Sequence, residues 1–389
     1  MNELLNATGQ IRGWGEARQW KGFDPYDALN SPYAQVLTLG TELGRRVLTQ
    51  GVKLCPVNLR PVLGIKPEWN AKAVALVASA YSRLAAAGDE TARQEAERWL
   101  TWLVTNHAGD DEGLAWGYHF DVQTRFFFYR RGTPNTIATS FAGQALLDGV
   151  ELLGDDRWGD PALSVIRFLS SRMRRDGYFR YLPDENELVH NANLLACAVF
   201  ARAGGLLGRD DLLSLARPPL TTSLRAQRDD GSWPYAEGPS GNWVDNFHTG
   251  YVLESLVHCS SLDRDVEESL TRGLHYWQQE LFLGDGTPKY TPGRTHPIDA
   301  HCYATAIDTL LAASSREPVA FQRAERIASL LIDRMLDPAG FVRFQERRFW
   351  TSRVPFVRWS TAPSFRALAG LLRARSDRRV AEDADARLD

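Results

Sequence analysis

The sequence of 389 residues lacks the features of a disulfide-rich, metal-binding or membrane-spanning protein. Its four cysteines, Cys55, Cys197, Cys259 and Cys302, lie far apart and show none of the CxxC-type spacings that hold zinc. No apolar run approaches the roughly 18 residues of a membrane span, and the first residues lack the basic and apolar segments of a signal peptide. We therefore expect a reduced, cytoplasmic protein that uses no metal ion or other cofactor.

The chain also lacks an excess of charge of either sign. It has 45 basic and 48 acidic residues, a net charge of −3, and no basic stripe interleaved with aromatic residues. A nucleic acid is therefore not an expected partner. Hydrophobic residues make up 44% and charged residues 24% of the chain, which is ordinary for a globular protein that buries a large core.

What the chain does have is a repeat of about 54 residues. Short aromatic segments, such as 178–181 and 341–344, follow a glycine turn in each repeat. The turn glycines are Gly177, Gly231, Gly286 and Gly340, which lie 54, 55 and 54 positions apart. Between the turns, apolar residues recur at helical spacing, for example over 136–153 and 246–258. Two helices and their connections fill one such unit.

A repeat of helical hairpins either stays open as a solenoid or closes on itself. An earlier turn at 111–114 and the helical patterns before it bring the count to five or six units. We therefore predict an all-α fold, an (α/α)6-type toroid of helical hairpins with short aromatic hairpin turns, in one domain over residues 1–372. The charged and apolar-poor residues 373–389 are expected to form a disordered tail.

Polar residues recur in the same phase, just before each apolar helix. The first series is Asn135, His190, Asp245 and Asp299, spaced by 55, 55 and 54 positions, and the second is Asn193, His248 and Cys302, spaced by 55 and 54. Asp and Asn are also favoured helix N-caps, which is the structural alternative for Asp245 and Asp299. Histidine is a poor cap. His190, His248 and His301 at one end of the toroid therefore indicate a site.

Two kinds of acid–base chemistry fit these residues. In a hydrolase, Asp245 and Asp299 would be the acid and the base, with His248 tuning one of them, because neighbouring inner helices place two carboxylates at the separation found in inverting glycosidases. In a lyase or epimerase acting on a uronate, His248 or His190 would abstract the C5 proton. Helix N-termini that converge on the site would favour anionic groups of the substrate.

Aromatic and polar residues near the helix starts supply candidates for substrate binding. Aromatic faces stack on sugar rings, although packing between hairpins is the alternative role for them. Arg125 or Asn193 would neutralise the substrate carboxylate, and Tyr118 would return a proton. The predicted substrate-binding residues are Tyr118, Arg125, Asn193, Trp233, Trp243, His301 and Arg358.

Two resemblances to known families attach to these segments. The string QRDDGSW at 227–233 resembles the glutamine–tryptophan repeat of squalene-cyclase and prenyltransferase-type toroids, in which a Gln and a Trp tie hairpins together. The DxDD proton donor of that family's class II cyclases is missing, because residues 263–266 read DRDV. The first resemblance therefore implies the fold and not the reaction.

The second resemblance covers about residues 14–370. The strings FDPYDALNS, PVNLRPVLGI, WGYHFDVQTR, HNANLL and DGSWPYAEGPSGNWVDNFHTGYVLE resemble uncharacterised α/α-toroid proteins encoded with bacterial exopolysaccharide genes. This resemblance implies a context of polysaccharide biosynthesis and brings no mechanism with it. Toroids that act on sugars include hydrolases, lyases and epimerases, so the substrate class rests on an analogy of fold.

The leading hypothesis is a carbohydrate-active enzyme of (exo)polysaccharide biosynthesis that uses metal-free acid–base chemistry on a glycosidic bond or a uronate. Its partner would be a glycan or an anionic small molecule. A terpenoid or prenyl-chain enzyme is one alternative, and it requires a dry, aromatic interior. A non-catalytic glycan-binding protein is the other, and its ligand affinity would be unchanged by Asp245→Asn.

Overall fold

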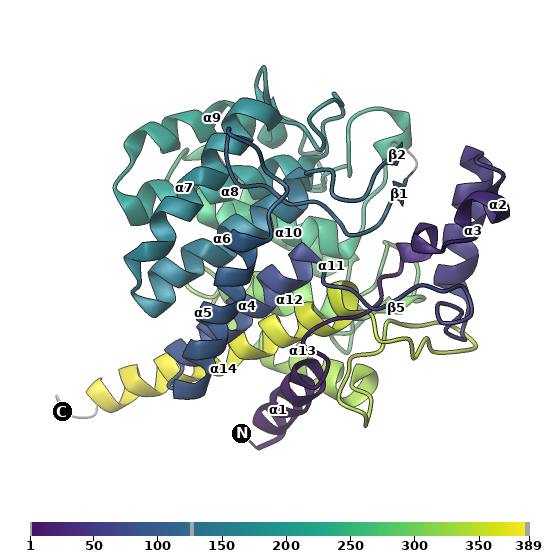
Figure 1. Cartoon of the computed structure of the whole chain (residues 1–389). Coiled ribbons are helices and arrows are strands. Elements are labelled where there is room, and N and C mark those ends of the chain that lie inside the picture. Colours follow the sequence, from purple (N-terminus) through teal and green to yellow (C-terminus); the bar gives the residue numbers. More distant parts are fainter. Residues whose placement is uncertain (1, 125–127, 386–389) are drawn as a thin grey trace.

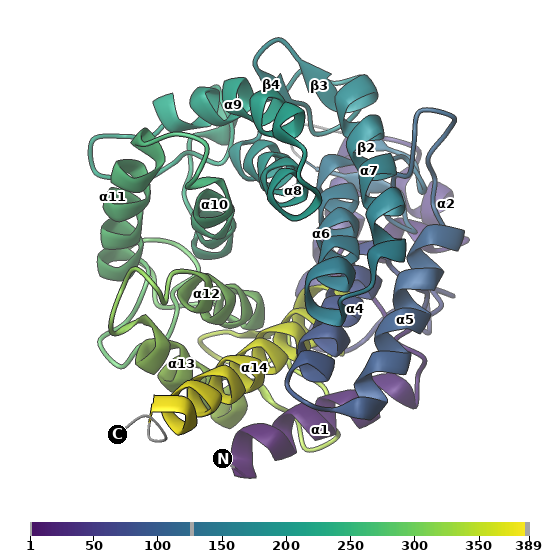
Figure 2. The ribbon, with the colours of Figure 1, turned by 90° about the vertical axis from the view of Figure 1, so that its left-hand side faces the viewer.

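The computed structural model describes residues 2–124 and 128–385, and helices make up most of it. Six helices form an inner ring, which Figure 2 shows end on. Each inner helix contacts the next one, and the last contacts the first, so the ring is closed. The inner helices are α4 (Ala71–Ala86), α6 (Thr136–Leu153), α8 (His190–Leu207), α10 (Asn246–Cys259), α12 (Ala300–Ala312) and α14 (Ala362–Asp385).

An outer ring of helices covers the inner one (Figure 2). Each outer helix packs on the inner helix of its own hairpin, and α1 packs on α14. The outer helices are α5 (Glu90–Thr105), α7 (Gly159–Phe168), α9 (Asp210–Arg225), α11 (Asp265–Glu280), α13 (Ala320–Met335) and α1 (Asn2–Glu16). This closed double ring confirms the predicted all-α toroid.

The burial of each helix explains its sequence pattern. Helix α8 contacts α6, α10 and α9, and its residues from Leu194 to Ala201 are buried all round. Helix α9 has only one covered face, where Leu212, Ala216 and Leu220 recur at a spacing of four and are buried. An inner helix is therefore apolar on every side, whereas an outer helix is amphipathic.

All inner helices begin at one end of the double ring, which we call the rim. N-cap side chains accept backbone N–H groups at the starts of four of them. These caps are Asn70, Asn135, Asp245 and Asp299. The N-cap role that the sequence offered as a structural alternative is thus confirmed for Asp245 and Asp299.

A second hydrogen bond repeats at the rim and explains the phase of the aromatic segments. The first backbone N–H of an inner helix donates to a carbonyl oxygen in the segment that follows the next glycine turn. The pairs are Thr136 with Tyr181, His190 with Tyr235, Asn246 with Tyr290 and Ala300 with Phe344, at 3.0, 3.0, 3.0 and 3.1 Å. Each aromatic segment therefore joins one hairpin to its neighbour in the ring.

Among the aromatic segments that follow the glycine turns, residues 178–179 form a strand, whereas 233–235, 289–290 and 341–344 do not. Three two-stranded antiparallel sheets are present in the described residues, each made of two consecutive strands. The strands are β1 (Val122–Gln123), β2 (Phe128–Tyr129), β3 (Arg174–Arg175), β4 (Tyr178–Phe179), β5 (Ile298–Asp299) and β6 (Gln345–Glu346).

The remaining segments include a helical hairpin that lies at the rim end, beside β1 and β2 (Figure 1). It consists of α2 (Ala34–Thr38) and α3 (Glu42–Leu54) and follows the short turn η1 (Asp27–Asn30). The other short helical turns are η2 (Asp156–Trp158), η3 (Leu169–Met173), η4 (Pro239–Gly241) and η5 (Val357–Thr361). No helix in the described ranges is long and apolar enough to cross a membrane.

The end of α14 differs from its prediction. In place of a disordered tail from residue 373, the helix continues to Asp385. Arg375 forms an ion pair of 2.7 Å with Glu325 of α13, and the Arg378 guanidinium lies 3.8 Å from the ring centroid of Phe321. The contacts of Arg375 and Arg378 with α13 stabilise the end of α14, although this segment has too few apolar residues to predict an ordered helix.

The turns require glycine both because of their backbone conformation and because there is no space for a side chain. Substitution of Gly231 tests this. Its φ is +90°, and an added Cβ would lie 2.5 Å from the carbonyl oxygen of Arg272. We expect Gly231→Ala to lower the free energy of unfolding by about 1–3 kcal/mol, measured by urea denaturation. Gly284→Ala is the matched control, because its Cβ would meet open space at an ordinary φ. Equal effects of the two substitutions would contradict the expectation.

Candidate active site

The residues that begin the inner helices enclose a cluster of histidines, aromatic rings and buried charges at the rim. One part of it is the pair Asp24 and Arg358, of which both side chains are buried. Arg358 Nε and Nη2 donate to the Asp24 carboxylate at 2.5 and 2.8 Å. Burial acts to raise the pKa of Asp24, but Arg358 outweighs it and the pKa is lowered. Arg358, predicted to bind substrate, is thus neutralised within the protein.

Tyr118 lies beside this pair. The Arg358 guanidinium is 4.7 Å from the ring centroid of Tyr118, which also stacks on Phe120 at 5.5 Å. Burial raises the pKa of Tyr118, and the neighbouring Tyr181 adds to this effect. Tyr118 and Arg358 therefore lie together, as part of one aromatic wall of the rim.

A chain of three polar side chains runs from α4 to α12 through α10. Lys72 Nζ lies 3.4 Å from the hydroxyl of Tyr251, and this hydroxyl lies 2.8 Å from His301 Nε2. His301 Nδ1 lies 2.6 Å from the carbonyl oxygen of Trp359, so it must carry the proton and donate. Nε2 of a neutral His301 then accepts from the Tyr251 hydroxyl. The tautomer of His301 is fixed by its two neighbours.

Burial governs the charges in this chain. Lys72 is 4% exposed, and its ammonium group lies over the rings of Phe141 and Tyr251 at 4.3 and 4.9 Å. Within the described ranges Lys72 forms no ion pair, and burial lowers its pKa well below 10.5, with Arg358 acting in the same direction. Burial likewise lowers the pKa of His301 well below 6.5, and Lys72 adds to the effect. Lys72 and His301 therefore hold an added proton weakly, whereas burial raises the pKa of Tyr251, which keeps its own proton.

Asp245 and His248 form a second arrangement on α10. One Asp245 carboxylate oxygen accepts the backbone N–H of His248 at 2.9 Å, and the other lies 2.8 Å from His248 Nδ1. Asp245 is 1% exposed, whereas the His248 side chain is 22% exposed. Nδ1 therefore donates to the carboxylate, and Nε2 has no hydrogen-bond partner among the described residues.

Phe247 connects the two histidine arrangements. Its ring centroid lies 4.0 Å from that of His248 and 5.0 Å from that of His301. The side chains of His248 and His301, predicted from their common phase, are therefore brought together at the rim around one aromatic ring.

His190 and Asn193 face another way. His190 Nδ1 lies 3.1 Å from Ser223 Oγ, and Asn193 Nδ2 donates to the same Ser223 Oγ at 2.8 Å and to the Pro219 carbonyl at 2.8 Å. Both partners belong to the outer helix α9. His190 Nε2 lies 3.2 Å from a carboxylate oxygen of the exposed Glu237, without the geometry of a hydrogen bond. These two residues tie α8 to α9 and do not join the other histidines.

Asp299 has both carboxylate oxygens occupied. It accepts the backbone N–H of His301 at 2.8 Å, Gln345 Nε2 at 2.6 Å and Trp359 Nε1 at 3.2 Å. Burial raises the pKa of Asp299 to about 6, against the lowering effect of these hydrogen bonds. Asp299 therefore holds the loop that carries Trp359 and Gln345 against α12.

A small cavity lies against His248 and Asp245. Its walls include Trp233, Trp243 and Asn191, and its volume of about 10 Å³ holds a single water molecule. Two buried polar atoms of these residues, Trp243 Nε1 and Asn191 Oδ1, have no hydrogen-bond partner. The Trp243 ring stacks on Tyr235 at 4.4 Å and lies 5.6 Å from His248. Two residues with an unpaired polar atom and one histidine therefore line the same small cavity.

Trp233 has a further role in the fold. Its Nε1 donates to the Ser223 carbonyl at 2.9 Å, and Gln227 Nε2 donates to the Ser269 carbonyl of α11 at 2.9 Å. The Gln227 bond joins the end of α9 to α11 of the next hairpin, whereas the Trp233 bond fixes the turn against its own helix α9. The remaining predicted residue, Arg125, lies outside the described residues.

Larger cavities occur away from the rim. One of about 300 Å³ lies between α11 and α13, and one of about 350 Å³ lies between α1 and α5. Neither is lined by any of the rim histidines. We place the candidate site at the smaller rim cavity, because polar groups suited to acid–base chemistry converge there. Among the described residues, no group of three or more His, Cys, Asp or Glu is placed to hold a metal ion.

The sequence reasoning missed several of these residues. Lys72 could have been found as a lone charged residue in the first turn of an apolar helix, and Asn191 lies between the candidate residues His190 and Asn193. Tyr251 gives no signal, because a tyrosine on an inner helix reads as core. Asp24 belongs to a segment that is dense in polar residues but far from the repeats in sequence.

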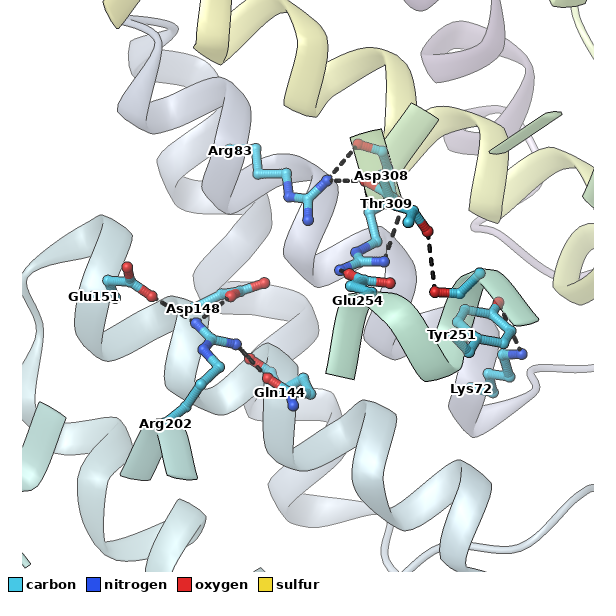
Figure 3. A network of polar contacts seen from close by, with 12 residues as sticks. Lys72, Arg83, Gln144, Asp148, Glu151, Arg202, Tyr251, Glu254, Asp308 and Thr309 are labelled. Carbon is cyan, nitrogen blue, oxygen red and sulfur yellow. Dashed lines mark hydrogen bonds and ion pairs between the residues drawn. The ribbon is translucent and has the colours of Figure 1, made fainter. Parts of the chain in front are cut away.

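Charged residues of the inner helices also pair with one another, as Figure 3 shows for Arg83, Asp308, Asp148 and Arg202. Arg366 donates to Asp308 at 3.0 Å and to Glu254 at 2.7 Å, and Arg83 donates to Asp308 at 2.5 Å. A second group, on α6 and α8, joins Arg202 to Asp148 at 2.8 Å. The sequence signal for these pairs is a charged residue deep in an apolar helix. It recurs in phase with the repeat, because Asp148 and Arg202 lie 54 positions apart, as do Glu254 and Asp308.

The rim histidine His119 makes stability depend on pH. Asn70 Nδ2 lies 3.3 Å from its Nδ1, and burial lowers the pKa of His119 to about 4, below the 6.5 of a free histidine. The unfolded chain then binds more protons, so the folded state loses stability as pH falls from about 6.5 to 4.

We expect His119→Gln to reduce this pH dependence. The free energy of unfolding of the wild type, measured in urea at a series of pH values, should fall relative to that of the variant between pH 6.5 and 4. Curves that stay parallel across this window would show that His119 does not titrate as described.

Comparison with known proteins locates the fold. No protein-family model and no curated protein matches the sequence. Among solved structures, a cellobiose 2-epimerase from Bacillus thermoamylovorans B4167 matches with a TM-score of 0.61 and 11% identity, over 80% of this chain and 90% of that chain. A GH76 α-mannanase from Bacteroides thetaiotaomicron gives 0.63 and 9%, over 79% and 87%. An unsaturated glucuronyl hydrolase specific for heparin gives 0.59 and 13%, over 79% and 86%. The chain is therefore an α/α toroid that shares its fold with these carbohydrate-active enzymes.

Proposed function

We propose that the chain is a carbohydrate-active enzyme that transfers protons on a sugar at the rim cavity, as an epimerase, isomerase or lyase does. One observation carries the proposal. Trp243 has an unpaired donor, Nε1, Asn191 has an unpaired acceptor, Oδ1, and both residues line the cavity together with His248. A sugar hydroxyl both donates and accepts, so it satisfies the two orphaned atoms together.

His248 is the proposed catalytic base. Asp245 fixes its tautomer and stabilises the imidazolium that forms when Nε2 takes a proton, which is the role of a carboxylate in a histidine dyad. Nε2 is uncommitted and belongs to the one partly exposed histidine at the cavity. A sugar hydroxyl bound by Trp243 and Asn191 would lie in the cavity that His248 also lines.

The Tyr251 hydroxyl is the proposed second proton-carrying group. His301 accepts its hydrogen bond and Lys72 lies 3.4 Å away, so the hydroxyl can pass a proton to either side. Phe247 separates it from His248. Epimerisation requires that a proton leave one face of a carbon and return to the other, so it needs a second proton-carrying group besides the base.

The hydrolase alternative has less support from the carboxylates. Asp245 and Asp299 have their oxygens occupied by hydrogen bonds, and Asp24 is neutralised by Arg358. A glycosidase needs one carboxylic acid and one carboxylate that both reach the scissile bond. Here the carboxylates orient other side chains instead.

The prenyl-chain alternative is disfavoured by buried ion pairs between the inner helices. It requires a dry, aromatic interior, whereas Arg366 of α14 pairs with Asp308 of α12 and Glu254 of α10. Figure 3 shows Asp308 and Glu254. The fold neighbours include enzymes named for cellobiose, mannan and heparin, which supports a sugar substrate. On the resemblance of its sequence strings, we further propose that the chain serves (exo)polysaccharide biosynthesis.

The proposal is tested by incubation with a panel of reducing mono- and disaccharides and uronate-containing oligosaccharides in D₂O. We expect a deuterium atom to enter one carbon-bound position of a panel sugar, seen by NMR, with an isomer or an unsaturated product. Release of a smaller sugar without carbon-bound deuterium would instead assign a hydrolase. Binding without any turnover across the panel would support the non-catalytic alternative.

A further inference from the structure

The helical hairpin α2–α3 and the loop that follows it expose an unusual amount of apolar surface. Nine large apolar side chains between residues 33 and 62 are exposed by 40–83%. They are Tyr33, Val36, Leu37, Leu39, Leu43, Val47, Leu54, Val57 and Val62, which we call the apolar patch. Among the described residues, six other large apolar side chains are at least 37% exposed, and they are dispersed along the chain. Contiguous patches of more than a few hundred Å² mark interaction sites.

The chemistry of the patch argues against a sugar platform. Tyr33 is its single aromatic member, and the rest are aliphatic. Sugars are held by aromatic faces and by hydrogen bonds, neither of which Val and Leu provide. An aliphatic surface of this kind suits hydrocarbon chains or another apolar surface instead.

The charge around the patch is basic, although the whole chain has a net charge of −3. Residues 33–67 hold Arg45, Arg46, Lys53, Arg60 and Lys66 against the single acid Glu42, and Arg60 is buried against Asp27. The rim loop 347–353 adds three arginines and no acid. Even with Arg46 paired to Glu42 at 3.4 Å, residues 33–67 and 347–353 each carry a surplus of positive charge.

Exposed aromatic rings at the rim are paired with arginines in the same way. Phe349 is 85% exposed, and the Arg348 guanidinium lies 5.2 Å from its ring centroid. Phe128, which is 37% exposed, has Arg45 at 4.1 Å and Arg130 at 5.2 Å. Apolar side chains flanked by Arg and Lys are the composition of a surface that lies in the headgroup region of an anionic bilayer.

We propose that the apolar patch and its basic surroundings dock the rim onto an anionic lipid surface. The aliphatic side chains of α2 and α3 enter the boundary of headgroups and acyl chains, and the arginines and lysines face the lipid phosphates. The hairpin projects from the double ring at the rim end (Figure 1), so docking turns the candidate site toward the bilayer. The sugar that reaches it is then one presented at a membrane surface.

The experiment is co-sedimentation of the full chain with vesicles of phosphatidylglycerol and phosphatidylcholine mixtures. We expect binding to rise with the anionic fraction and to weaken with salt. Leu39→Ser/Leu43→Ser should lower the partition coefficient at least tenfold, because two exposed side chains leave the acyl boundary. Leu206→Ser/Val319→Ser is the control, since these exposed residues lie on the body of the double ring, and it should bind as the wild type does.

Three results would overturn the proposal. They are absence of vesicle binding, equal binding to pure phosphatidylcholine, and a dimer in analytical ultracentrifugation that the Leu39→Ser/Leu43→Ser variant abolishes while vesicle binding stays unchanged. The last result would assign the patch to a second copy of the chain. None of these measurements requires turnover, so a failure here is distinct from a failure of the proposed sugar chemistry.

Discussion

His248→Ala should abolish deuterium exchange into the sugar while the protein remains folded. The substitution removes the only partly exposed imidazole at the rim cavity and leaves the N-cap bond from Asp245 to the backbone N–H of residue 248 in place. General-base catalysis contributes roughly 10²–10⁴-fold, so the exchange rate should fall by at least two orders of magnitude. The measurement is the rate of deuterium incorporation by NMR, with circular dichroism to check the fold.

The matched control is His275→Ala. His275 is exposed on the outer helix α11 and should leave the exchange rate unchanged. Asp245→Asn should lower the rate as well. The amide has one oxygen, which cannot accept both the backbone N–H and Nδ1–H of His248, so the tautomer of His248 is no longer fixed. A His248→Ala variant with wild-type exchange would remove His248 from the mechanism and leave the Tyr251 hydroxyl as the remaining candidate.

Arg366→Met should cause the largest loss of stability. Arg366 joins two carboxylates on different inner helices, Asp308 of α12 and Glu254 of α10, and all three side chains are about nine-tenths buried. Its removal leaves Glu254 without its cation near the ring axis, where water cannot replace it fully. Breaking a buried pair in this way typically costs about 3–5 kcal/mol. The free energy of unfolding in urea measures it.

Arg316→Met is the control for this prediction. Arg316 also pairs with an acid, Glu267, but both side chains are about a third to a half exposed. Exposed pairs contribute about 0–1 kcal/mol, so the loss should be small. If the two substitutions had equal effects, the axial ion pairs would contribute no more to the ring than surface pairs do.

The repeat made the fold predictable, whereas it predicted the site only in part. The turn glycines and the helical periodicity determine the hairpins, and a ring of such hairpins closes by packing alone. The phase of the polar residues located the rim, but phase does not say toward which side a residue points. Asn193 and His248 occupy equivalent positions, yet Asn193 binds the outer helix α9 and His248 lines the cavity.

Residues outside the repeat were the least predictable. Asp24 pairs with Arg358 across 334 positions in the chain, and Lys72 meets Tyr251 across 179. Ring closure brings Asp24 to Arg358, because it joins the first and the last hairpins, whereas Lys72 of α4 meets Tyr251 of α10 although α4 and α10 are not neighbours in the ring. The aliphatic side chains of α2 and α3 face solvent, whereas an amphipathic helix normally packs its apolar face on a core. Their exposure is therefore evident only from the structure.

The location of the sugar is the most direct test of this account. A crystal structure of His248→Ala with a panel sugar that exchanges deuterium in the wild type would show it. We expect a hydroxyl within hydrogen-bond distance of both Trp243 Nε1 and Asn191 Oδ1, with one carbon of the sugar next to the position of the His248 imidazole. A sugar bound in the groove between α11 and α13, with the rim cavity unchanged, would contradict the account.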